Sequence, residues 1–229
     1  MIISSADFHP TRATNPSHVG IIPDGCRRWA RQHGVSLQEG YDHAMRNLFR
    51  LLGVLFENKV VTASVYMSSR QNFRRSPGEI EAFCRAEADA CRTLVPELAR
   101  RFSLCVKTAG EVTIIPEYLR QALHSVAADY QATNGHRLYL CVAYDPFDEL
   151  EHAIQRRTGN ECLANFLWIP QPLDLVIRTG GSNLISNFLP LQAGFSRLHF
   201  SQKLFTDFTP SDLQQVLSEF GEHARLYGE

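Results

Sequence analysis

Six short apolar runs, separated by longer stretches with a helical period, limit the fold of this chain more than any other feature. The runs are rich in β-branched residues and predict strands at 18–22, 60–67, 103–110, 137–144, 173–180 and 197–201. Helices are predicted at about 41–58, 78–101, 116–132, 147–157 and 210–226. Such alternation is typical of an α/β protein with a mostly parallel sheet. Several runs are apolar without alternating with polar residues, which is expected when helices cover both faces of the sheet.

The chain gives no sign of a second domain. Its 229 residues suffice for one large α/β domain, and no internal repeat, low-complexity tract or linker interrupts them. No window approaches the roughly 20 consecutive apolar residues that a membrane-spanning helix needs. Residues 1–17 lack a basic region followed by a hydrophobic stretch, so we predict a short N-terminal leader there.

Charge and cysteine usage limit the partners and the compartment. The formal net charge is −1, which gives no general attraction to nucleic acid and allows at most a peripheral contact with membranes. The six cysteines are scattered, with no CxxC pair and no zinc-type His/Cys spacing. Most of them lie in apolar runs, so buried free thiols are favoured over disulfides. These features predict a cytoplasmic protein in which any anion site is a local cluster.

Three loops carry most of the polar residues that could form a site. In an open parallel sheet, ligands bind outside the carboxyl ends of the strands. The loops after the first, second and fifth predicted strands read PDGCRRW (23–29), SSRQNFRR (68–75) and RTGGSNLISNF (178–188). All three are rich in Arg, Ser, Asn or Gly, so we expect them to meet around one cleft.

The first loop combines an acid with donors for an anion. Gly25 lets the backbone approach a ligand, and the amide groups at the start of a following helix favour phosphate. Arg27 and Arg28 add charged donors, whereas Asp24 would repel phosphate unless Mg²⁺ bridges the two. The alternative is a turn in which Asp24 caps an amphipathic helix with a solvated basic face. This loop alone leaves both interpretations open.

The second and third loops differ in specificity. The second offers two hydroxyls, two amides and three arginines, and its composition also fits a solvated surface loop. In the third, Arg178 ends an apolar strand and Gly180-Gly181 form a flexible turn. We expect Ser186 and Asn187 to lie early in a helix, which would repeat the anion-binding arrangement of the first loop.

Several other chemistries lack their motifs. The sequence contains no GxSxG elbow of a hydrolase, no Walker A loop, no GxGxxG fingerprint and no HExxH zinc motif. Two or three anion-binding loops around one cleft, with a single acid, favour diphosphate chemistry instead.

The motifs in these loops resemble those of the cis-prenyltransferases, the undecaprenyl diphosphate synthase family. HVGIIPDGCRRWARQHG (18–34) resembles the family signature HxAIxMDGNxRWA, and SSRQNFRR resembles FSxENWxR. The segment 174–208 resembles the family's stretch from DLxIRTxGE to a WPDF-like end, and RLYG (225–228) resembles its closing RRxG. The resemblance therefore runs from about residue 18 to the C-terminus, with the motifs in order.

The resemblance implies a fold, a cofactor and an assembly. Members of the family have a six-stranded parallel sheet surrounded by helices, a hydrophobic tunnel for the growing chain, and usually a homodimeric assembly. They couple an allylic diphosphate to isopentenyl diphosphate with Mg²⁺. Residues 18–229 would then form the catalytic domain.

The resemblance also places the ligands of the allylic diphosphate in the first loop. Asp24 would hold Mg²⁺ and this diphosphate. The diphosphate would be surrounded by the next four residues, which are Gly25, Cys26, Arg27 and Arg28. Trp29 would pack beneath them.

The other two loops would supply catalytic and acceptor-site residues. Asn72 and Arg75 match the catalytic Asn and the Arg of the family's second motif, and Arg178 and Ser186 match two ligands of the acceptor diphosphate. We expect Asn72, Ser68 or Ser69 to position a diphosphate oxygen or to take up a proton. A dry apolar pocket would protect the carbocation, and four residues could line it: Tyr66, Met67, Phe73 and Tyr144.

Six positions depart from the family pattern. Cys26 replaces an Asn, Leu37 and Tyr41 replace an Arg and a His, Ser182 and Leu184 replace a Glu and an Arg, and Arg197 replaces a metal-binding Glu. We expect Arg197 either to supply positive charge in the acceptor site in place of Mg²⁺ or to mark a disabled acceptor site.

PDGCRRW followed by GVSLQEGY (34–41) is similar to a divergent branch of the family, the lavandulyl and cyclolavandulyl diphosphate synthases. These enzymes join two dimethylallyl diphosphates head-to-middle, and some cyclise the product. That branch keeps the Arg and the Glu that Leu184 and Arg197 replace here. We predict a Mg²⁺-dependent prenyltransferase that couples short allylic diphosphates irregularly, with or without cyclisation. The alternatives are regular elongation with isopentenyl diphosphate, a single-substrate terpene cyclase, and a non-catalytic subunit of a heteromeric enzyme.

Overall fold

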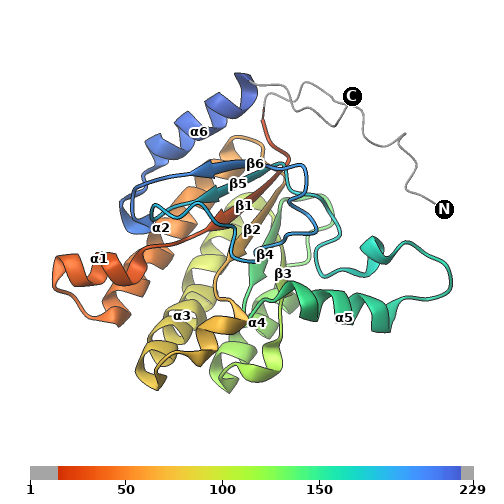
Figure 1. The fold of residues 1–229 in the computed structure, drawn as a ribbon, viewed down its shortest axis with the longest axis horizontal. Coiled ribbons are helices and arrows are strands. Elements are labelled where there is room, and N and C mark those ends of the chain that lie inside the picture. The colour runs from red at the N-terminus through yellow and green to blue at the C-terminus, as the bar shows by residue number, and fades with distance from the viewer. Residues whose placement is uncertain (1–14, 223–229) are drawn as a thin grey trace.

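All six predicted strands pair in one parallel sheet in the computed structural model, which describes residues 15–222. The strands are β1 (His18–Ile22), β2 (Thr62–Tyr66), β3 (Cys105–Ala109), β4 (Arg137–Cys141), β5 (Leu175–Arg178) and β6 (Arg197–Phe200). Their order across the sheet is β3-β4-β2-β1-β5-β6, so β1 lies near the centre and β6 is an edge strand (Figure 1). Because every pair is parallel, the carboxyl ends of all six strands meet at one edge.

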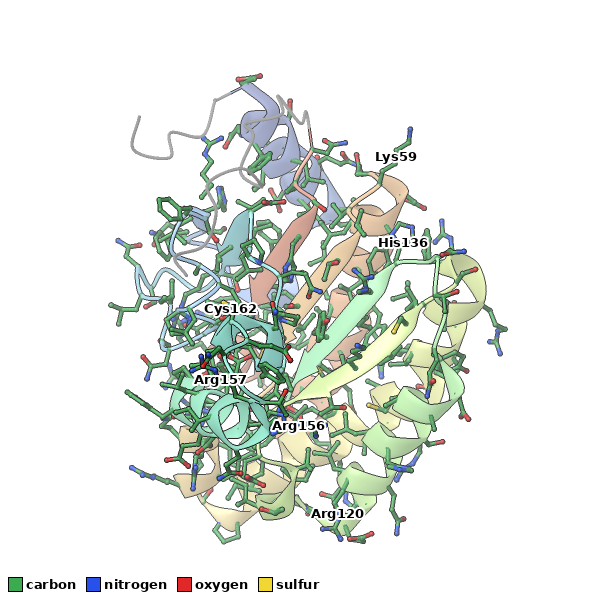
Figure 2. All side chains as sticks on the ribbon, turned by 90° about the vertical axis from the view of Figure 1, so that its right-hand side faces the viewer. Lys59, Arg120, His136, Arg156, Arg157 and Cys162 are labelled. Carbon is green, nitrogen blue, oxygen red and sulfur yellow. The ribbon has the colours of Figure 1, made fainter. Side chains whose placement is uncertain are left out.

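Within the described residues, six α-helices accompany the sheet. They are α1 (Cys26–His33), α2 (Leu37–Glu57), α3 (Pro77–Phe102), α4 (Glu117–Asp129), α5 (Pro146–Arg156) and α6 (Pro210–Glu222). Lys59 and His136 precede the neighbouring strands β2 and β4, and Figure 2 shows them near each other at the amino edge of the sheet. The predicted six-stranded α/β fold is confirmed.

Alternating side chains along the strands build two apolar layers. In β1, Val19 and Ile21 face the larger core, which α2, α3, α4 and α6 cover. Ile22 faces a second, smaller core. The apolar partners of this second core come from irregular segments, for example Leu173 and Phe188, rather than from helices. The expectation that helices cover both faces therefore holds for only one of them.

Local capping explains why α2 starts earlier than predicted. The side chain of Ser36 accepts the amide proton of Glu39, and the Glu39 carboxylate accepts that of Ser36. This reciprocal capping box fixes the first turn at Leu37, four residues before the predicted start. The apolar periodicity on which the prediction rested becomes regular only at Ala44, after the capped turn.

Two further predictions concern the ends of the chain and the cysteines. Most of the predicted leader and the RLYG motif at 225–228 lie outside the described residues. All six cysteines are free thiols, which confirms the prediction against disulfides. No helix in residues 15–222 is both long enough and apolar enough to cross a bilayer.

Candidate active site

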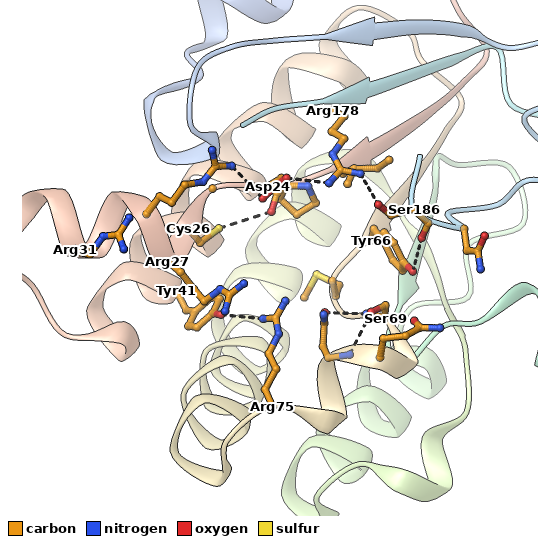
Figure 3. A pocket seen from close by; sticks show the side chains of 18 residues that line it. Asp24, Cys26, Arg27, Arg31, Tyr41, Tyr66, Ser69, Arg75, Arg178 and Ser186 are labelled. Carbon is orange, nitrogen blue, oxygen red and sulfur yellow. Dashed lines mark hydrogen bonds and ion pairs between the residues drawn. The ribbon is translucent and has the colours of Figure 1, made fainter. Parts of the chain in front are cut away.

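The three polar loops meet around one cavity at the carboxyl edge of the sheet (Figure 3). The cavity has a volume of about 980 Å³. Its lining comes from the ends of β1 and β5, the first two turns of α1, the 3₁₀ turn η2 (Arg70–Arg74) and one residue of α2, Tyr41. The prediction that these loops share a cleft is confirmed.

Thr179 fixes the backbone of Asp24 in this cavity. The Thr179 hydroxyl accepts the Asp24 amide proton at 3.1 Å and donates to the Asp24 carbonyl at 2.9 Å. The Asp24 carboxylate is then held between two guanidiniums, with Arg178 at 2.9 Å and Arg28 at 3.4 Å. Its side chain keeps 32% of its surface exposed, so one carboxylate faces the cavity from between two cations.

Gly25 starts α1 without a side-chain cap. Its φ of +108° lies in the region that favours glycine, and a Cβ there would come within 2.8 Å of Leu204. Since Asp24 gives no capping hydrogen bond, the alternative interpretation of Asp24 as a helix cap is wrong. The first amide groups of α1 are not used within the helix, and the residues that carry them, Cys26, Arg27 and Arg28, line the cavity.

Arg178 connects the first and third loops. One guanidinium nitrogen donates to the Leu184 carbonyl at 2.5 Å and to the Ser186 hydroxyl at 2.7 Å, while the other contacts Asp24. The side chain is only 9% exposed. Arg28 adds a second link because it donates to the Gly180 carbonyl at 2.7 Å.

The third loop does not form the predicted helix. Ser186 and Asn187 have φ values of +49° and +61°, so they lie in a left-handed turn. Pro190 follows shortly after and disfavours helical geometry at the residue before it. The bonds from Arg178 hold this turn against the sheet, and both turn residues line the cavity.

The second loop is organised by a small capping box. Ser69 and Asn72 exchange hydrogen bonds, with the Ser69 amide donating to the Asn72 side chain at 3.0 Å and the Asn72 amide donating to Ser69 at 3.2 Å. Arg75 pairs with Glu79 at 2.8 Å and donates to the Tyr41 hydroxyl at 3.4 Å. Ser69, Asn72 and Arg75 all line the cavity.

A second pair of arginines thus shares an acid on the α3 side of the cavity. Arg27 from α1 lies 3.3 Å from the same Glu79 oxygen that Arg75 contacts. Arg27 and Arg75 line the cavity, whereas the Glu79 carboxylate that they share lies behind them, outside the lining.

Three predicted site residues lie away from the cavity. Trp29 is on the far side of α1, where it donates to Asp207 at 2.8 Å and stacks on His33. Ser68 is buried, and its hydroxyl accepts the Ala143 amide proton at 3.3 Å.

Arg197 begins β6 in register with Leu175, at the amino edge of the sheet, and donates to the Glu219 carbonyl. The structure does not bring Arg197 to this cavity. Arg197 is the first residue of β6, so the length of that strand separates it from the carboxyl ends of the strands, where the cavity lies.

Sequence reasoning missed several lining residues. Arg31, Tyr41 and Gln71 line the cavity but were not predicted as ligands. Arg31 lies one helical turn after Arg27, so the helical spacing carried a signal for it. Among the four predicted apolar lining residues, Tyr66 and Met67 face the cavity, whereas Phe73 and Tyr144 are not part of its lining.

Comparison with known proteins identifies the family. Residues 22–228 match the model of a family described as putative undecaprenyl diphosphate synthase. The chain belongs to this prenyltransferase family. The prenyltransferase is 31% identical over 230 residues to a tritrans,polycis-undecaprenyl-diphosphate synthase (geranylgeranyl-diphosphate specific) of Thermoplasma acidophilum, and the match covers 93% of this chain and 89% of that protein.

Two solved structures extend the comparison. The prenyltransferase is similar to lavandulyl diphosphate synthase from Lavandula x intermedia, solved in complex with dimethylallyl diphosphate, with a TM-score of 0.86 and 29% identity. That match covers 94% of this chain and 99% of the other. A probable undecaprenyl diphosphate synthase from Campylobacter jejuni shares the fold, with a TM-score of 0.79 and 20% identity. The predicted resemblance to both branches is confirmed.

Burial keeps two polar groups of the cavity wall neutral. Burial, reinforced by the nearby Asp24 carboxylate, raises the pKa of the Cys26 thiol to about 12. Burial likewise raises the pKa of Tyr41 to about 12. Neither group ionises near neutral pH, so Cys26 is not a thiolate nucleophile and Tyr41 stays a hydroxyl donor in the prenyltransferase.

The residues of the cavity fit a magnesium ion only together with a ligand. Within residues 15–222, no three His, Cys, Asp or Glu side chains are grouped closely enough to hold a metal alone. Mg²⁺ commonly binds through one or two carboxylates plus substrate phosphates and water. Asp24 meets this requirement because its carboxylate faces the cavity beside arginines that would hold the phosphates.

Proposed function

We propose that this prenyltransferase binds short allylic diphosphates with Mg²⁺ and couples two of them head-to-middle. The observation that carries the proposal is the Asp24 carboxylate, held between Arg28 and Arg178 in the cavity that the first turn of α1 lines. A carboxylate between cations at a helix start suits a metal-bridged diphosphate.

The first half of the reaction breaks the allylic carbon–oxygen bond, so negative charge grows on the leaving diphosphate. Mg²⁺ held by Asp24 would supply Lewis-acid stabilisation of that charge. Arg28 and Arg178 would turn from Asp24 to the diphosphate oxygens, as charge-assisted donors. The allylic cation would then form a carbon–carbon bond to the double bond of the second substrate, and the proton lost from the product would go to the released diphosphate. Ser69 and Asn72, which also line the cavity, would orient a diphosphate oxygen for this transfer.

Irregular coupling is supported by the similarity to lavandulyl diphosphate synthase, although the acceptor loop departs from both branches of the family at Leu184. The family's acceptor-side Glu and Arg are Ser182 and Leu184 here, and the Leu184 side chain is 66% exposed. The acceptor loop thus offers fewer charged ligands, whereas Arg27 and Arg75 gather at Glu79. A second allylic diphosphate beside Arg27 and Arg75 would fit this distribution of charge.

Regular elongation with isopentenyl diphosphate is the second candidate. It is favoured by the curated relatives, among them an isoprenyl transferase of Campylobacter jejuni that is 25% identical over 218 residues. It would require the hydrophobic tunnel that the family resemblance implies, entered past Tyr66 and Met67.

A homodimer in the cytoplasm belongs to the same proposal. Several large apolar side chains are exposed on the described surface, among them Phe147, Ile154, Leu191 and Leu198. Exposed apolar residues of this kind commonly mark a surface that a second copy covers. Six free thiols fit a reducing compartment.

The test is product analysis after incubation with Mg²⁺ and dimethylallyl, geranyl or farnesyl diphosphate, with and without isopentenyl diphosphate. We expect a branched ten-carbon diphosphate from dimethylallyl diphosphate alone, and none when Mg²⁺ is chelated. Product that forms only with isopentenyl diphosphate would exclude irregular coupling and favour elongation. Conversion of a single geranyl or farnesyl diphosphate would indicate a cyclase, and activity only with a second polypeptide would indicate a subunit.

A further inference from the structure

A second cavity lies behind the catalytic one and has no part in the proposed reaction. It has a volume of about 670 Å³. We call it the η2–η3 groove, after η2 and the 3₁₀ turn η3 (Val112–Ile114). The groove is lined by five apolar and two basic residues: Phe73, Ile80, Ile114, Ile115, Pro116, Arg70 and Arg74.

The apolar part of the groove is a surface that water reaches. Ile114 is 40% exposed, whereas Ile115 beside it is buried. Phe73 and Ile80 are partly buried and pack against the larger core. Branched aliphatic side chains around an open depression favour a short branched hydrocarbon, because binding removes apolar surface from water on both sides.

The basic part of the groove is a pair of arginines on one 3₁₀ turn. Arg70 bonds to Asp148 on α5. Arg74 is exposed and forms no ion pair within residues 15–222, so it supplies the net positive charge of the rim. The Arg74 guanidinium, unpaired in the described part of the chain, lies beside an apolar floor and matches a ligand with a phosphate head and an apolar tail.

We propose that the η2–η3 groove is a second binding site for a short prenyl diphosphate, the substrate or the product of the reaction. The identity of this ligand rests on the proposed function, since that function makes such molecules the protein's own substrates and products. The volume fits a chain of about five to ten carbons, within the usual range of small-molecule pockets.

The turn η2 separates this site from the catalytic cavity. Gln71 and Asn72 face the catalytic cavity, while Arg70, Phe73 and Arg74 face the groove. A ligand in the groove would therefore contact the back of the turn that presents Asn72. A prenyl diphosphate bound in the groove would be separated from the reacting centre by the turn η2.

The experiment is photolabelling of the full chain with a diazirine-bearing short prenyl diphosphate, followed by peptide mapping. Residues 112–116 mark the groove, because none of them lines the catalytic cavity, and residues 178–188 mark the catalytic site. We expect labels in both peptides of the wild type, and competition by unlabelled dimethylallyl diphosphate at both.

Variants separate the two sites. Arg74→Glu should lower the label at 112–116 about tenfold through loss of a charge-assisted contact, and Ile114→Asp should do so through loss of apolar burial. Each variant should leave the label at 178–188 unchanged. Asp24→Ala should do the reverse. Arg46→Glu, an equal charge change on an exposed position of α2, should change neither. Circular dichroism and melting temperature establish that each variant is folded.

Three results would overturn the proposal. The first is a label confined to 178–188 in the wild type. The second is a label at 112–116 that Arg74→Glu and Ile114→Asp leave unchanged. The third is competition at 112–116 by phosphatidylglycerol vesicles but not by dimethylallyl diphosphate, which would assign the groove to a lipid surface. Labelling at 112–116 without turnover of any prenyl diphosphate would refute the proposed function while the groove stands as a prenyl diphosphate site.

Discussion

At the scale of single residues, Arg178 organises the candidate site. Its guanidinium reaches the Asp24 carboxylate, the Ser186 hydroxyl and the Leu184 carbonyl from the end of a buried strand. The planar fork of five N–H donors suits several acceptors in fixed directions, which a lysine ammonium cannot reproduce. Arg178 thus holds the Leu184–Ser186 part of the third loop, beside the bonds that Arg28 and Tyr66 donate to Gly180 and Ser186.

Arg178→Lys should therefore lower kcat/KM by about 100-fold, the equivalent of losing one or two hydrogen bonds to charged groups. Steady-state kinetics with dimethylallyl diphosphate measures the change. Arg46→Lys, at an exposed position of α2, serves as the matched control. Kinetics for Arg178→Lys that equal the control would show that the fork geometry is dispensable.

Residue types and spacing identified the charged residues of the site, but not the direction in which every side chain points. Asp24, Arg28 and Arg178 were predicted from motifs that follow strands, and all three line the cavity. Trp29 packs behind the first loop, as expected, and does not itself line the cavity, because a helix start presents only one of its faces to the ligand. Arg197 lies at the amino ends of the strands, so it supplies no charge to this cavity; the alternative, that it marks a disabled acceptor site, stays a prediction.

At the scale of elements, the approach of α1 to the sheet depends on Gly25. Its left-handed φ and its contact with Leu204 leave no room for a side chain. Gly25→Ala should lower the free energy of unfolding by about 1–3 kcal/mol and reduce turnover, because α1 must shift.

Gly78 provides the control for that variant. It lies in the first turn of α3 with ordinary φ and open space around it, so Gly78→Ala should be neutral or stabilising by about 0.5–1 kcal/mol. Urea unfolding compares the two. Equal stability of the two variants would contradict the argument from Gly25.

The buried carboxyl of Glu87 gives α3 a pH-dependent stability. Glu87 is 1% exposed, and burial raises its pKa from 4.5 to about 8. Between those values the folded protein holds a proton that the unfolded chain has lost, so its contribution to stability is complete at low pH and falls as pH rises toward 8.

Glu87→Gln should remove this dependence. Relative to that variant, the wild type should lose about 3 kcal/mol of unfolding free energy between about pH 5.5 and 8.5. Urea titrations at several pH values measure the difference, with Glu97→Gln at an exposed position of the same helix as control. A wild type that gains stability over this range relative to Glu87→Gln would refute the argument.

Helices and strands were predicted well where apolar periodicity defines them. They were predicted poorly where hydrogen bonds from polar side chains define them. All six strands were found: five of the predicted runs contain β-branched residues, and the sixth, RLHFS (197–201), has alternating apolar residues instead. The first turn of α2 was missed because Ser36 and Glu39 make it, not apolar residues. The helix expected at Ser186 is absent because Arg178 and Pro190, on either side, impose a turn.

At the scale of the whole molecule, the edge strand β6 leaves part of its surface open. Leu198 in this strand is 46% exposed, and no strand of residues 15–222 pairs beyond it. Exposed apolar residues on an edge strand favour association. A sequence alone does not show this surface, since exposure depends on which strand ends at the edge.

Sedimentation velocity should therefore give a dimer for the wild type and a smaller species for Leu198→Glu. A glutamate in the predicted interface would be buried on association, so it should weaken the dimer. The fold itself should tolerate the charge, because position 198 is exposed in one copy of the chain. Gln214→Glu, an exposed substitution on α6, is the control. A monomeric wild type would end the homodimer prediction.

The central claim is that an allylic diphosphate reacts at Asp24. The most direct measurement is release of inorganic diphosphate from dimethylallyl diphosphate with Mg²⁺, comparing the wild type with Asp24→Ala and with Asp42→Ala as control. We predict that Asp24→Ala abolishes release while its melting temperature and circular dichroism stay those of a folded protein, and that Asp42→Ala releases diphosphate normally. Undiminished release by a folded Asp24→Ala would contradict the claim.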